Sequence, residues 1–466
     1  MDIVNLISAN MPSGFWENII GWFNSFITSY GWAIIVFTIA LKIVLSPLDF
    51  YQKISMRKTQ KQQALIQPEL DKIKEKYGDN KELVNQKTME LYQKNKISPL
   101  GGCIGMLINL VLTFVIFFTL FGSMNNISQF KVANEYSNLQ YEYELFVTNQ
   151  TTINIDGDEL SHQQCYDYGI DYYNNQTEKP KKQDGTDYAN AEEYGAYFAQ
   201  TCAQVKVSDK FGQIKEGWLW IDNIFRPDTN ASAFPSYSEF LKSTNNSLYN
   251  VKLEEGTQKE YYYISPVTTE VFYLTDNAET NAQILADAKV QGEKDFNTIT
   301  GLVQAEYGSW NGYFILIIFA ALSTLASQLL ANAGMKAKNK KGEEVNVPKQ
   351  SNKVMMIILP LLMVWFTWSY SAAFAIYIII NSIASALIGY VLNIIISKID
   401  NKSEQKKLVT VTNNKSTVKG KVNVVDSSDY RIEKKGKIVE DKQEKPKRKT
   451  STKSKKSVEQ TDKGDN

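Results

Sequence analysis

The chain contains 466 residues, of which 43% are hydrophobic and 22% are charged, and its formal net charge is +1. These averages conceal a strong segregation, because long apolar runs alternate with runs rich in lysine or in acidic residues. Five of the apolar runs approach the roughly 20 residues that cross a bilayer as a helix. The composition therefore excludes an ordinary soluble protein and predicts a polytopic membrane protein.

The apolar runs define the predicted fold class, an all-α polytopic membrane protein built as a five-span helical bundle. The predicted spans are residues 31–50, 99–122, 310–332, 354–370 and 371–397. The last two are joined by the short polar turn Ser369-Tyr370-Ser371. We therefore expect them to form one membrane hairpin.

Lysine and arginine residues set the predicted orientation of the spans. Residues 51–98 carry 11 of them, and residues 333–353 carry six. Short loops rich in these residues remain in the cytoplasm. We therefore expect both segments and the tail 398–466 to be cytoplasmic, and residues 1–30 and 123–309 to lie outside.

Residues 1–30 contain no lysine or arginine and so lack the basic start of a cleavable signal peptide. We expect the first span to insert with the N-terminus outside. Large apolar side chains at helical spacing also predict an amphipathic helix at the outer interface. Its apolar face contains Phe15, Trp16, Ile19, Ile20, Trp22, Phe23, Phe26 and Ile27. Its polar face contains Glu17, Asn18, Asn24 and Ser25.

Residues 51–98 are predicted to form a cytoplasmic helical hairpin. Apolar residues recur at near-helical spacing on both sides of the turn signal Tyr77-Gly78-Asp79-Asn80. Pro68 is compatible with the first turn of a helix that restarts after Gln67. Its many charges are compatible with a solvated helix face and with a specific binding surface.

The region 123–309 is a separate compositional zone, with 28 acidic and 13 basic residues. Aromatic strand-like runs such as 259–274 and a polar helical stretch near 277–305 predict a large extracytoplasmic insert that includes a folded domain. The sequence does not define its fold. Cys165 and Cys202 lie in this region, where a disulfide and two free thiols are both chemically permitted.

The tail 398–466 is basic and rich in lysine, serine, threonine and acidic residues, with few large apolar side chains. Such a composition cannot bury enough apolar surface to fold, so the tail is predicted to be disordered. Its positive charge is compatible with binding to ribosomal RNA. It is equally compatible with contact to anionic lipids.

Several kinds of chemistry lack the residues they need. His162 is the only histidine, which removes histidine-based metal clusters and histidine-dependent nucleophilic catalysis. No glycine-rich phosphate loop occurs, and no internal repeat suggests a secondary transporter. We therefore expect no enzyme activity, no cofactor, no metal and no small-molecule substrate.

Lys42 lies well inside the apolar run 31–50. A lysine at the centre of a spanning helix costs about 2.5–3.5 kcal/mol on insertion scales. Its ammonium can extend along its aliphatic stem to the lipid headgroups. Alternatively, it faces a wet groove inside the helix bundle, and that groove is the functional site.

Four stretches carry a family resemblance. They are LKIVLSPLDFYQKISMRKTQKQQALIQPELDKIKEKYGDN with the following LYQKNKISPLGGC, then GWLWIDNIFRPD at 217–228, MMIILPLLMVWF, and the pair Tyr377 and Asn381. Together they resemble the YidC/Oxa/Alb family of membrane insertases. The first stretch is the most specific, because it combines the basic residue of the span, a proline motif and the hairpin turn.

The resemblance implies a five-span bundle with a polar groove that is open to the cytoplasm and to lipid but closed to the outside. Members of the family use it to insert nascent membrane proteins and help them fold in the bacterial plasma membrane, without nucleotide, alone or beside the Sec translocon. Lys42 occupies the position of the family's groove arginine, and Gln328 matches a polar groove position. The expected groove residues are Lys42, Gln328, Ser327, Thr324, Asn381 and Tyr377.

The chain also departs from the family pattern. Lysine in place of arginine keeps the point charge but loses planar, bidentate recognition. Ile378 stands where many relatives have tryptophan, and Ser98 and Gly105 replace an asparagine and a proline of the motif. Segments of about 127–214 and 229–305 are expected to be inserts foreign to the family.

Two alternatives remain open for the function and its site. Polar residues in spans, such as Ser327 and Gln328, often only bond neighbouring helices. A membrane-anchored adhesin or receptor would explain the acidic outer region, but it leaves Lys42 and the hairpin without a purpose. The expected partners of an insertase are nascent membrane proteins, the ribosome, the Sec translocon and anionic lipids.

Overall fold

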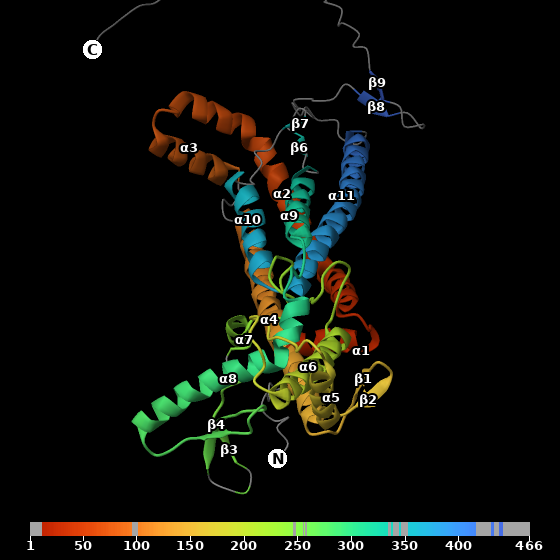
Figure 1. Ribbon diagram of the computed structural model, residues 1–466. Coiled ribbons are helices and arrows are strands. Elements are labelled where there is room, and N and C mark those ends of the chain that lie inside the picture. Colours follow the sequence, from red (N-terminus) through yellow and green to blue (C-terminus); the bar gives the residue numbers. More distant parts are fainter. Residues whose placement is uncertain are drawn as a thin grey trace, which may run out of the picture. The chain divides into compact units, whose positions relative to one another are not determined.

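Figure 1 shows the computed structural model of the chain. It describes residues 12–95, 101–245, 248–254, 256, 259–333, 337–338, 344–345, 353–415, 430–432 and 438–440. The chain divides into two units, Met1–Lys402 and Ser403–Asn466. The second unit includes a short antiparallel hairpin of β8 (Tyr430–Ile432) and β9 (Ile438–Glu440).

All five predicted spans coincide with apolar helices. These helices are α2 (Tyr30–Tyr77), α4 (Gly101–Val147), α9 (Ile315–Ala333), α10 (Lys353–Ser369) and α11 (Ala372–Lys415). Within the described residues, three apolar segments are long enough to cross a membrane: Tyr30–Ser55, Val111–Val147 and Ala372–Ile399. Helices α9 and α10 contain shorter apolar runs. The chain is therefore a mostly helical membrane protein, and the count of five spans stays a prediction.

The long helices present apolar side chains that no part of the described chain covers. On α10 the exposed residues include Ile357, Ile358, Leu361, Trp365 and Trp368. Contiguous apolar surface of this kind is rare on soluble monomers. A lipid environment removes it from water.

Helix α2 runs without interruption through both Pro47 and Pro68. The predicted restart of a helix at Pro68 is therefore wrong. A proline removes the N–H that would bond the carbonyl four residues earlier, and at Pro47 the deprived carbonyl is that of Ile43. The Ser46 hydroxyl donates a hydrogen bond to this carbonyl at 2.8 Å, which helps the helix to pass the proline.

The predicted helical hairpin is confirmed for its described residues (Figure 1). Helix α3 (Lys81–Lys94) follows α2 after the expected turn, and the side chain of Asn80 accepts a hydrogen bond from the Leu83 N–H at 3.1 Å. Ile66 and Leu70 of α2 pack with Leu91 of α3 in a small separate core. This core holds the two arms of the hairpin together.

Helix α1 (Phe15–Phe26) is amphipathic as predicted, but one of its polar residues was placed wrongly. Glu17 is only 7% exposed, and the Asn126 side-chain amide donates to its carboxylate at 3.4 Å. The Trp16 indole also donates to the Thr119 hydroxyl of α4 at 3.0 Å. Glu17 therefore faces α4, because the polar part of α4 continues beyond its apolar run.

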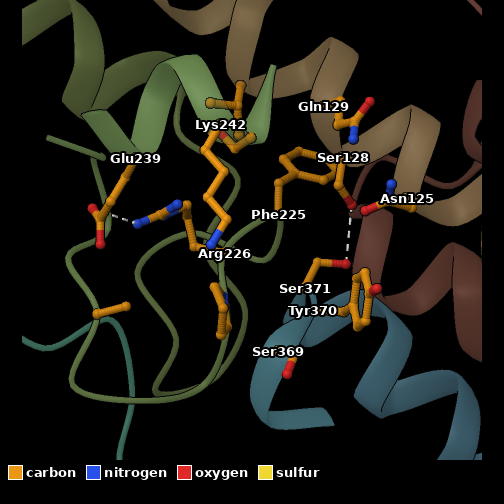
Figure 2. Close-up of a pocket in the computed structure, with 14 residues that line it drawn as sticks. Asn125, Ser128, Gln129, Phe225, Arg226, Glu239, Lys242, Ser369, Tyr370 and Ser371 are labelled. Atoms are coloured by element: carbon orange, nitrogen blue, oxygen red, sulfur yellow. Dashed lines mark hydrogen bonds and ion pairs between the residues drawn. The ribbon is translucent and has the colours of Figure 1, made fainter. Parts of the chain in front are cut away.

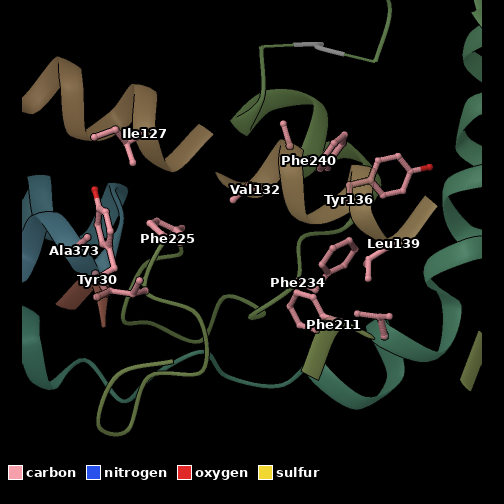
Figure 3. Close-up of a cluster of buried hydrophobic side chains, with 14 of the residues drawn as sticks. Tyr30, Ile127, Val132, Tyr136, Leu139, Phe211, Phe225, Phe234, Phe240 and Ala373 are labelled. Carbon is pink, nitrogen blue, oxygen red and sulfur yellow. The ribbon is translucent and has the colours of Figure 1, made fainter. Parts of the chain in front are cut away.

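The region 123–309 is folded, and its buried side chains belong to one core that continues into α1, α2, α9, α10 and α11. Helix α4 continues past the predicted end of its span at residue 122 and packs with α5 (His162–Asn175), α6 (Ala191–Ile214), α7 (Tyr237–Ser243) and α8 (Ala278–Tyr307). Figure 3 shows part of the buried cluster, including Tyr136 and Phe240. The ring of Tyr136 lies 4.9 Å from that of Phe296 and 5.0 Å from that of Phe240. The region is therefore folded around the extension of α4 and is continuous with the core of the apolar helices.

Short antiparallel strands lie between the helices. They are β1 (Ile153–Ile155) with β2 (Asp158–Leu160), the three-stranded sheet of β3 (Lys252–Leu253), β4 (Glu260–Ile264) and β5 (Val271–Tyr273), and β6 (Ala337–Lys338) with β7 (Glu344–Val345). The predicted strand-like run 259–274 is confirmed as β4 and β5. The predicted polar helix is confirmed as α8, whose N-cap Asn277 accepts from two backbone N–H groups.

Cys165 of α5 and Cys202 of α6 are both buried and both free thiols. A hydrogen bond joins the two side chains. Burial raises the pKa of each thiol above its ordinary value. The two residues therefore act as small packing groups between the helices.

We expect neither Cys165 nor Cys202 to react with a water-soluble maleimide at neutral pH in the folded protein, because both thiols are buried and protonated. After denaturation without reductant, both are expected to react. Mass spectrometry of a Cys103→Ala variant measures the two thiols alone. A denatured sample that gains no label until a reductant is added contains a disulfide and contradicts the free-thiol assignment.

Candidate functional site

Lys42 lies in the apolar segment Tyr30–Ser55 of α2, and its side chain is partly exposed. It makes no hydrogen bond or ion pair with any residue that the structure describes. Its neighbour Ile43 is exposed on the same stretch of helix. The carboxylate of Asp49, about two turns further along α2, attracts the Lys42 ammonium electrostatically without forming an ion pair. Within the described part of the chain the ammonium has no bonded partner, so water or lipid headgroups must solvate it.

Helix α9 contributes three of the predicted groove residues. Thr324 is buried, and its hydroxyl lies 3.3 Å from that of Ser382 on α11. Ser327 is partly exposed. The amide nitrogen of Gln328 is buried and has no hydrogen-bond partner among the described residues. A buried polar group without a partner costs about 1–3 kcal/mol, so Gln328 is poorly explained by packing alone.

Helix α11 contributes Tyr377 and Asn381, which lie one turn apart on the same face. Tyr377 is buried, and its ring stacks on Phe374 at 6.0 Å. Phe374 in turn contacts Phe117 of α4 at 5.9 Å. Asn381 is partly exposed, and its carbonyl accepts from the Ser385 hydroxyl at 2.6 Å. Tyr377 is therefore at least partly a packing residue, whereas Asn381 is accessible.

Helices α2 and α11 run in the same direction, and hydrogen bonds join them beyond the position of Lys42. The Lys53 ammonium donates to the Gly389 carbonyl at 2.6 Å and to the Asn393 side-chain oxygen at 3.3 Å. The Arg57 guanidinium donates to the Ser397 hydroxyl at 3.4 Å. These bonds fix the relative register of the two helices.

These hydrogen bonds allow the position of Lys42 along α2 to be compared with positions along α11. Lys42 precedes Lys53 by 11 residues, or about 16 Å at the 1.5 Å rise of an α-helix. The same step back from Gly389 on α11 reaches Ile378. The same step back from Asn393 reaches Ser382, so a common level of Lys42 with Tyr377 and Asn381 stays a prediction, and no hydrogen bond or ion pair joins Lys42 to them in the described part of the chain.

The segment 217–228 fixes the N-terminal end of α9. Asp228 is fully buried, and its carboxylate accepts hydrogen bonds from the N–H groups of Tyr313 at 2.8 Å and Leu316 at 2.6 Å. A carboxylate is favourable there because helix N-termini present unpaired N–H groups and positive potential. A Cβ at Gly312 would lie only 1.9 Å from the carboxylate oxygen. Glycine is therefore required beside this cap.

The same segment fixes the N-terminal end of α11. The Arg226 carbonyl accepts from the Ala372 N–H at 2.8 Å, and the Ile224 carbonyl accepts from the Ala373 N–H at 3.0 Å. These N–H groups belong to the first turn, which has no acceptors inside the helix. Residues 224–228 therefore join the ends of α9 and α11.

A buried polar network holds this segment in place. The Asn223 N–H donates to the Asn311 side-chain oxygen at 2.7 Å, and the Asn311 amide donates back to the Asn223 carbonyl at 3.0 Å. The Asn223 amide also donates to both oxygens of Glu135 on α4, at 3.1 and 3.0 Å. We call Glu135, Asn223, Asp228 and Asn311 the polar lock. It connects α4 to the segment 223–228, which caps the N-terminal ends of α9 and α11.

The polar lock was missed in the sequence. Asn223 and Asp228 stand among large apolar residues in WLWIDNIFRPD. Polar residues that are buried among apolar ones are nearly always hydrogen-bonded. Their position within an apolar run is therefore the signal that could have identified them. The partners of Asn223 are Glu135 and Asn311, which lie 88 residues away in each direction.

These features define the class of the protein. Long apolar helices are held together at one end by buried hydrogen bonds, and one of them carries an unpaired lysine within its apolar segment. The molecule is a helical integral membrane protein with polar groups among its apolar helices.

Comparison with known proteins identifies the family. The family model described as 60Kd inner membrane protein matches residues 22–152 and 205–400, well over half of the chain. The chain therefore belongs to this family of bacterial membrane proteins. No solved structure matches it.

The chain is also similar to curated relatives named membrane protein insertase YidC. It is 44% identical over 94 residues to that of Fusobacterium nucleatum, a match of 20% of this chain and 44% of the relative. It is 40% identical over 99 residues to that of Anaeromyxobacter sp. (strain Fw109-5), a match of 21% and 17%. The matched part is less than half the length of each relative.

The family match also covers part of the predicted inserts. The second matched block spans 205–400, which includes 229–305, and the first block extends to residue 152. Between the two matched blocks 153–204 falls outside the match, and the bounds of the expected inserts at 127–214 and 229–305 stay a prediction. In the structure the extension of α4 and helix α8 share one core with the segment that carries the polar lock.

Proposed function

We propose that this protein is a membrane protein insertase and chaperone, which moves short polar segments of nascent membrane proteins across the bilayer through a groove among α2, α9 and α11. The observation that carries the proposal is Lys42, an unpaired cation within an apolar spanning segment. The residues Gln328, Ser327, Thr324, Asn381 and Tyr377 complete the proposed groove. The names of the relatives support the same class of function.

The proposed mechanism follows from solvation. Lys42 and the unpartnered Gln328 amide draw water into the inner half of the bilayer, which shortens the apolar distance that a polar segment must cross. The ammonium attracts acidic groups and backbone carbonyls of the incoming chain. Burial of the client's apolar helix in lipid then favours insertion by about 25 cal/mol per Å².

The proposed topology has five spans, with the α2–α3 hairpin and the C-terminal tail in the cytoplasm and the region 123–309 outside. The lysine-rich character of 51–98 and 333–353 supports this orientation. The segment 224–228, which the polar lock holds in place, would then close the groove on the outer side, because it joins the N-terminal ends of α9 and α11. The basic tail is proposed to contact the ribosome or anionic lipids, and the Sec translocon is a proposed partner.

Reconstitution tests the proposal. The purified protein is placed in liposomes, and insertion of a small single-span client is followed by protease protection. The fraction with its hairpin outside is measured by proteolysis of the exposed lysine-rich hairpin. The proposal expects insertion to rise with that fraction. Equal insertion of the client in liposomes with and without the protein contradicts the proposal. That result favours the alternative, a membrane-anchored adhesin or receptor that uses the acidic region 123–309.

Gln328→Leu is expected to raise the thermal stability of the protein while it lowers client insertion severalfold. The substitution removes a buried amide donor that has no partner and replaces it with an apolar side chain, which relieves a cost of about 1–3 kcal/mol. Thermal unfolding in micelles and the liposome assay measure the two effects. Thr324→Val, which breaks the contact with Ser382, is the control that should lower stability. Full insertion by Gln328→Leu contradicts a groove role for this residue.

A further inference from the structure

A cavity of about 530 Å³ lies beside the polar lock, apart from the proposed groove. It is bounded by α4, residues 225–231, α7 and the turn between α10 and α11 (Figure 2). Its polar lining includes Asn125, Ser128, Gln129, Ser243, Ser369 and Ser371. The Ser128 hydroxyl donates to that of Ser371 at 3.0 Å, which connects α4 to the start of α11. The volume is in the range of small-ligand sites.

Two cations share this cavity with a single carboxylate. The side chain of Arg226 is only 8% exposed; its Nε donates to the Ser232 carbonyl and its Nη2 to Glu239, both at 3.1 Å. Its other N–H groups make no hydrogen bond to a described residue. Burial lowers the pKa of Arg226 from its ordinary value, and the Glu239 carboxylate opposes that shift.

Lys242 supplies the second cation. It lines the same cavity as Arg226, and Figure 2 shows its side chain extending from α7. Lys242 has no hydrogen bond or ion pair with any residue that the structure describes. Glu239 is the only acidic residue of the lining, so one positive charge is left without a partner. This is unusual in a region where acidic residues outnumber basic ones by 28 to 13.

We propose that this cavity binds the phosphodiester headgroup of an anionic membrane lipid. A phosphodiester carries one negative charge, which matches the unpaired positive charge, and its oxygens suit the unused N–H groups of a guanidinium. The neighbouring serine hydroxyls and amides provide further donors. The ligand chemistry is that of a phosphoryl anion, which a lipid or a soluble phosphate ester can supply.

The position of the cavity favours the lipid. Trp365 and Trp368 are exposed on the last turns of α10, directly before the cavity residues Ser369 to Ser371. Tryptophan at the end of an apolar helix marks the membrane interface, where headgroups lie. This inference rests on the proposed membrane placement of α10 and goes beyond insertion of clients.

The test uses the purified full-length protein in micelles with a fluorescent phosphatidylglycerol as the probe and a fluorescent phosphatidylcholine as its zwitterionic counterpart. The inference expects tighter binding of phosphatidylglycerol. Lys242→Gln is expected to weaken it about fivefold. Lys294→Gln is the matched control, because Lys294 is exposed on α8 and does not line the cavity. Lys242 is itself exposed, so its replacement leaves the core intact.

Competition by glycerol phosphate separates the two sources of the anion. Displacement only at concentrations far above those of the lipid assigns the site to the headgroup, whereas displacement at equal concentrations assigns it to a soluble phosphate ester. Two results overturn the inference. One is equal binding of phosphatidylglycerol and phosphatidylcholine with no effect of glycerol phosphate. The other is an equal loss of affinity for phosphatidylglycerol in Lys242→Gln and Lys294→Gln. Client insertion is measured separately, so failure here leaves the insertase proposal untouched.

Discussion

Lys42→Met is expected to lower insertion of a client with an acidic outer segment by about ten- to a hundredfold, because a hydrogen bond to a charged group contributes roughly 1.5–3 kcal/mol. Methionine keeps a flexible unbranched side chain but removes the charge and its water. Lys42→Ala is expected to be impaired as well. Lys42→Arg is expected to retain insertion, because the site needs a positive charge more than it needs a planar guanidinium. Protease protection in liposomes measures all three.

The matched control for Lys42 is Lys58→Met, because Lys58 is an exposed lysine on the same helix beyond the apolar segment. This variant is expected to insert clients normally. A client with a neutral outer segment should respond less to Lys42→Met than an acidic client does. Full activity of Lys42→Met and Lys42→Ala would return Lys42 to the role of a lysine that merely reaches the headgroups.

Local signals in the sequence were sufficient for the helices and the hairpin. The apolar runs coincide with α2, α4, α9, α10 and α11, and the turn at 77–80 leads to α3 with Asn80 as its N-cap. These features depend on residues within one or two turns of each other. The ends of the helices were predicted less well, because polar packing partners decide where they stop. Helix α4 continues past residue 122, and Glu17 is buried against it.

Contacts between distant residues could not be predicted from the sequence. Asn223 meets Asn311 across 88 residues, and Thr324 meets Ser382 across 58. Neither pair has a sequence pattern, because each depends on how the helices pack. Lys42 was identified by its cost in an apolar run, a local property. Its relation to Gln328 and Tyr377 is tertiary, and it stays a prediction.

Asp228→Ala is expected to lower the free energy of unfolding by about 3–5 kcal/mol, because it leaves the N–H groups of Tyr313 and Leu316 without acceptors and removes a buried cap. The matched control is Asp222→Ala in the same segment. Asp222 has a side chain 48% exposed in an ion pair with Lys215, and such pairs contribute about 0–1 kcal/mol. Reversible unfolding in mixed micelles compares the two. Equal losses contradict the assignment of Asp228 as the cap of α9.

Gly312 allows the cap to be tested without removing the carboxylate. A Cβ at this position would lie 1.9 Å from the Asp228 carboxylate, so Gly312→Ala alone is expected to displace it and destabilise the fold. In the Asp228→Ala background the same substitution meets a smaller side chain and should cost less. Contacting residues are expected to show such coupling in a double-mutant cycle. Additive effects would mean that Gly312 and Asp228 act independently, and that α9 begins where it does for reasons outside the polar lock.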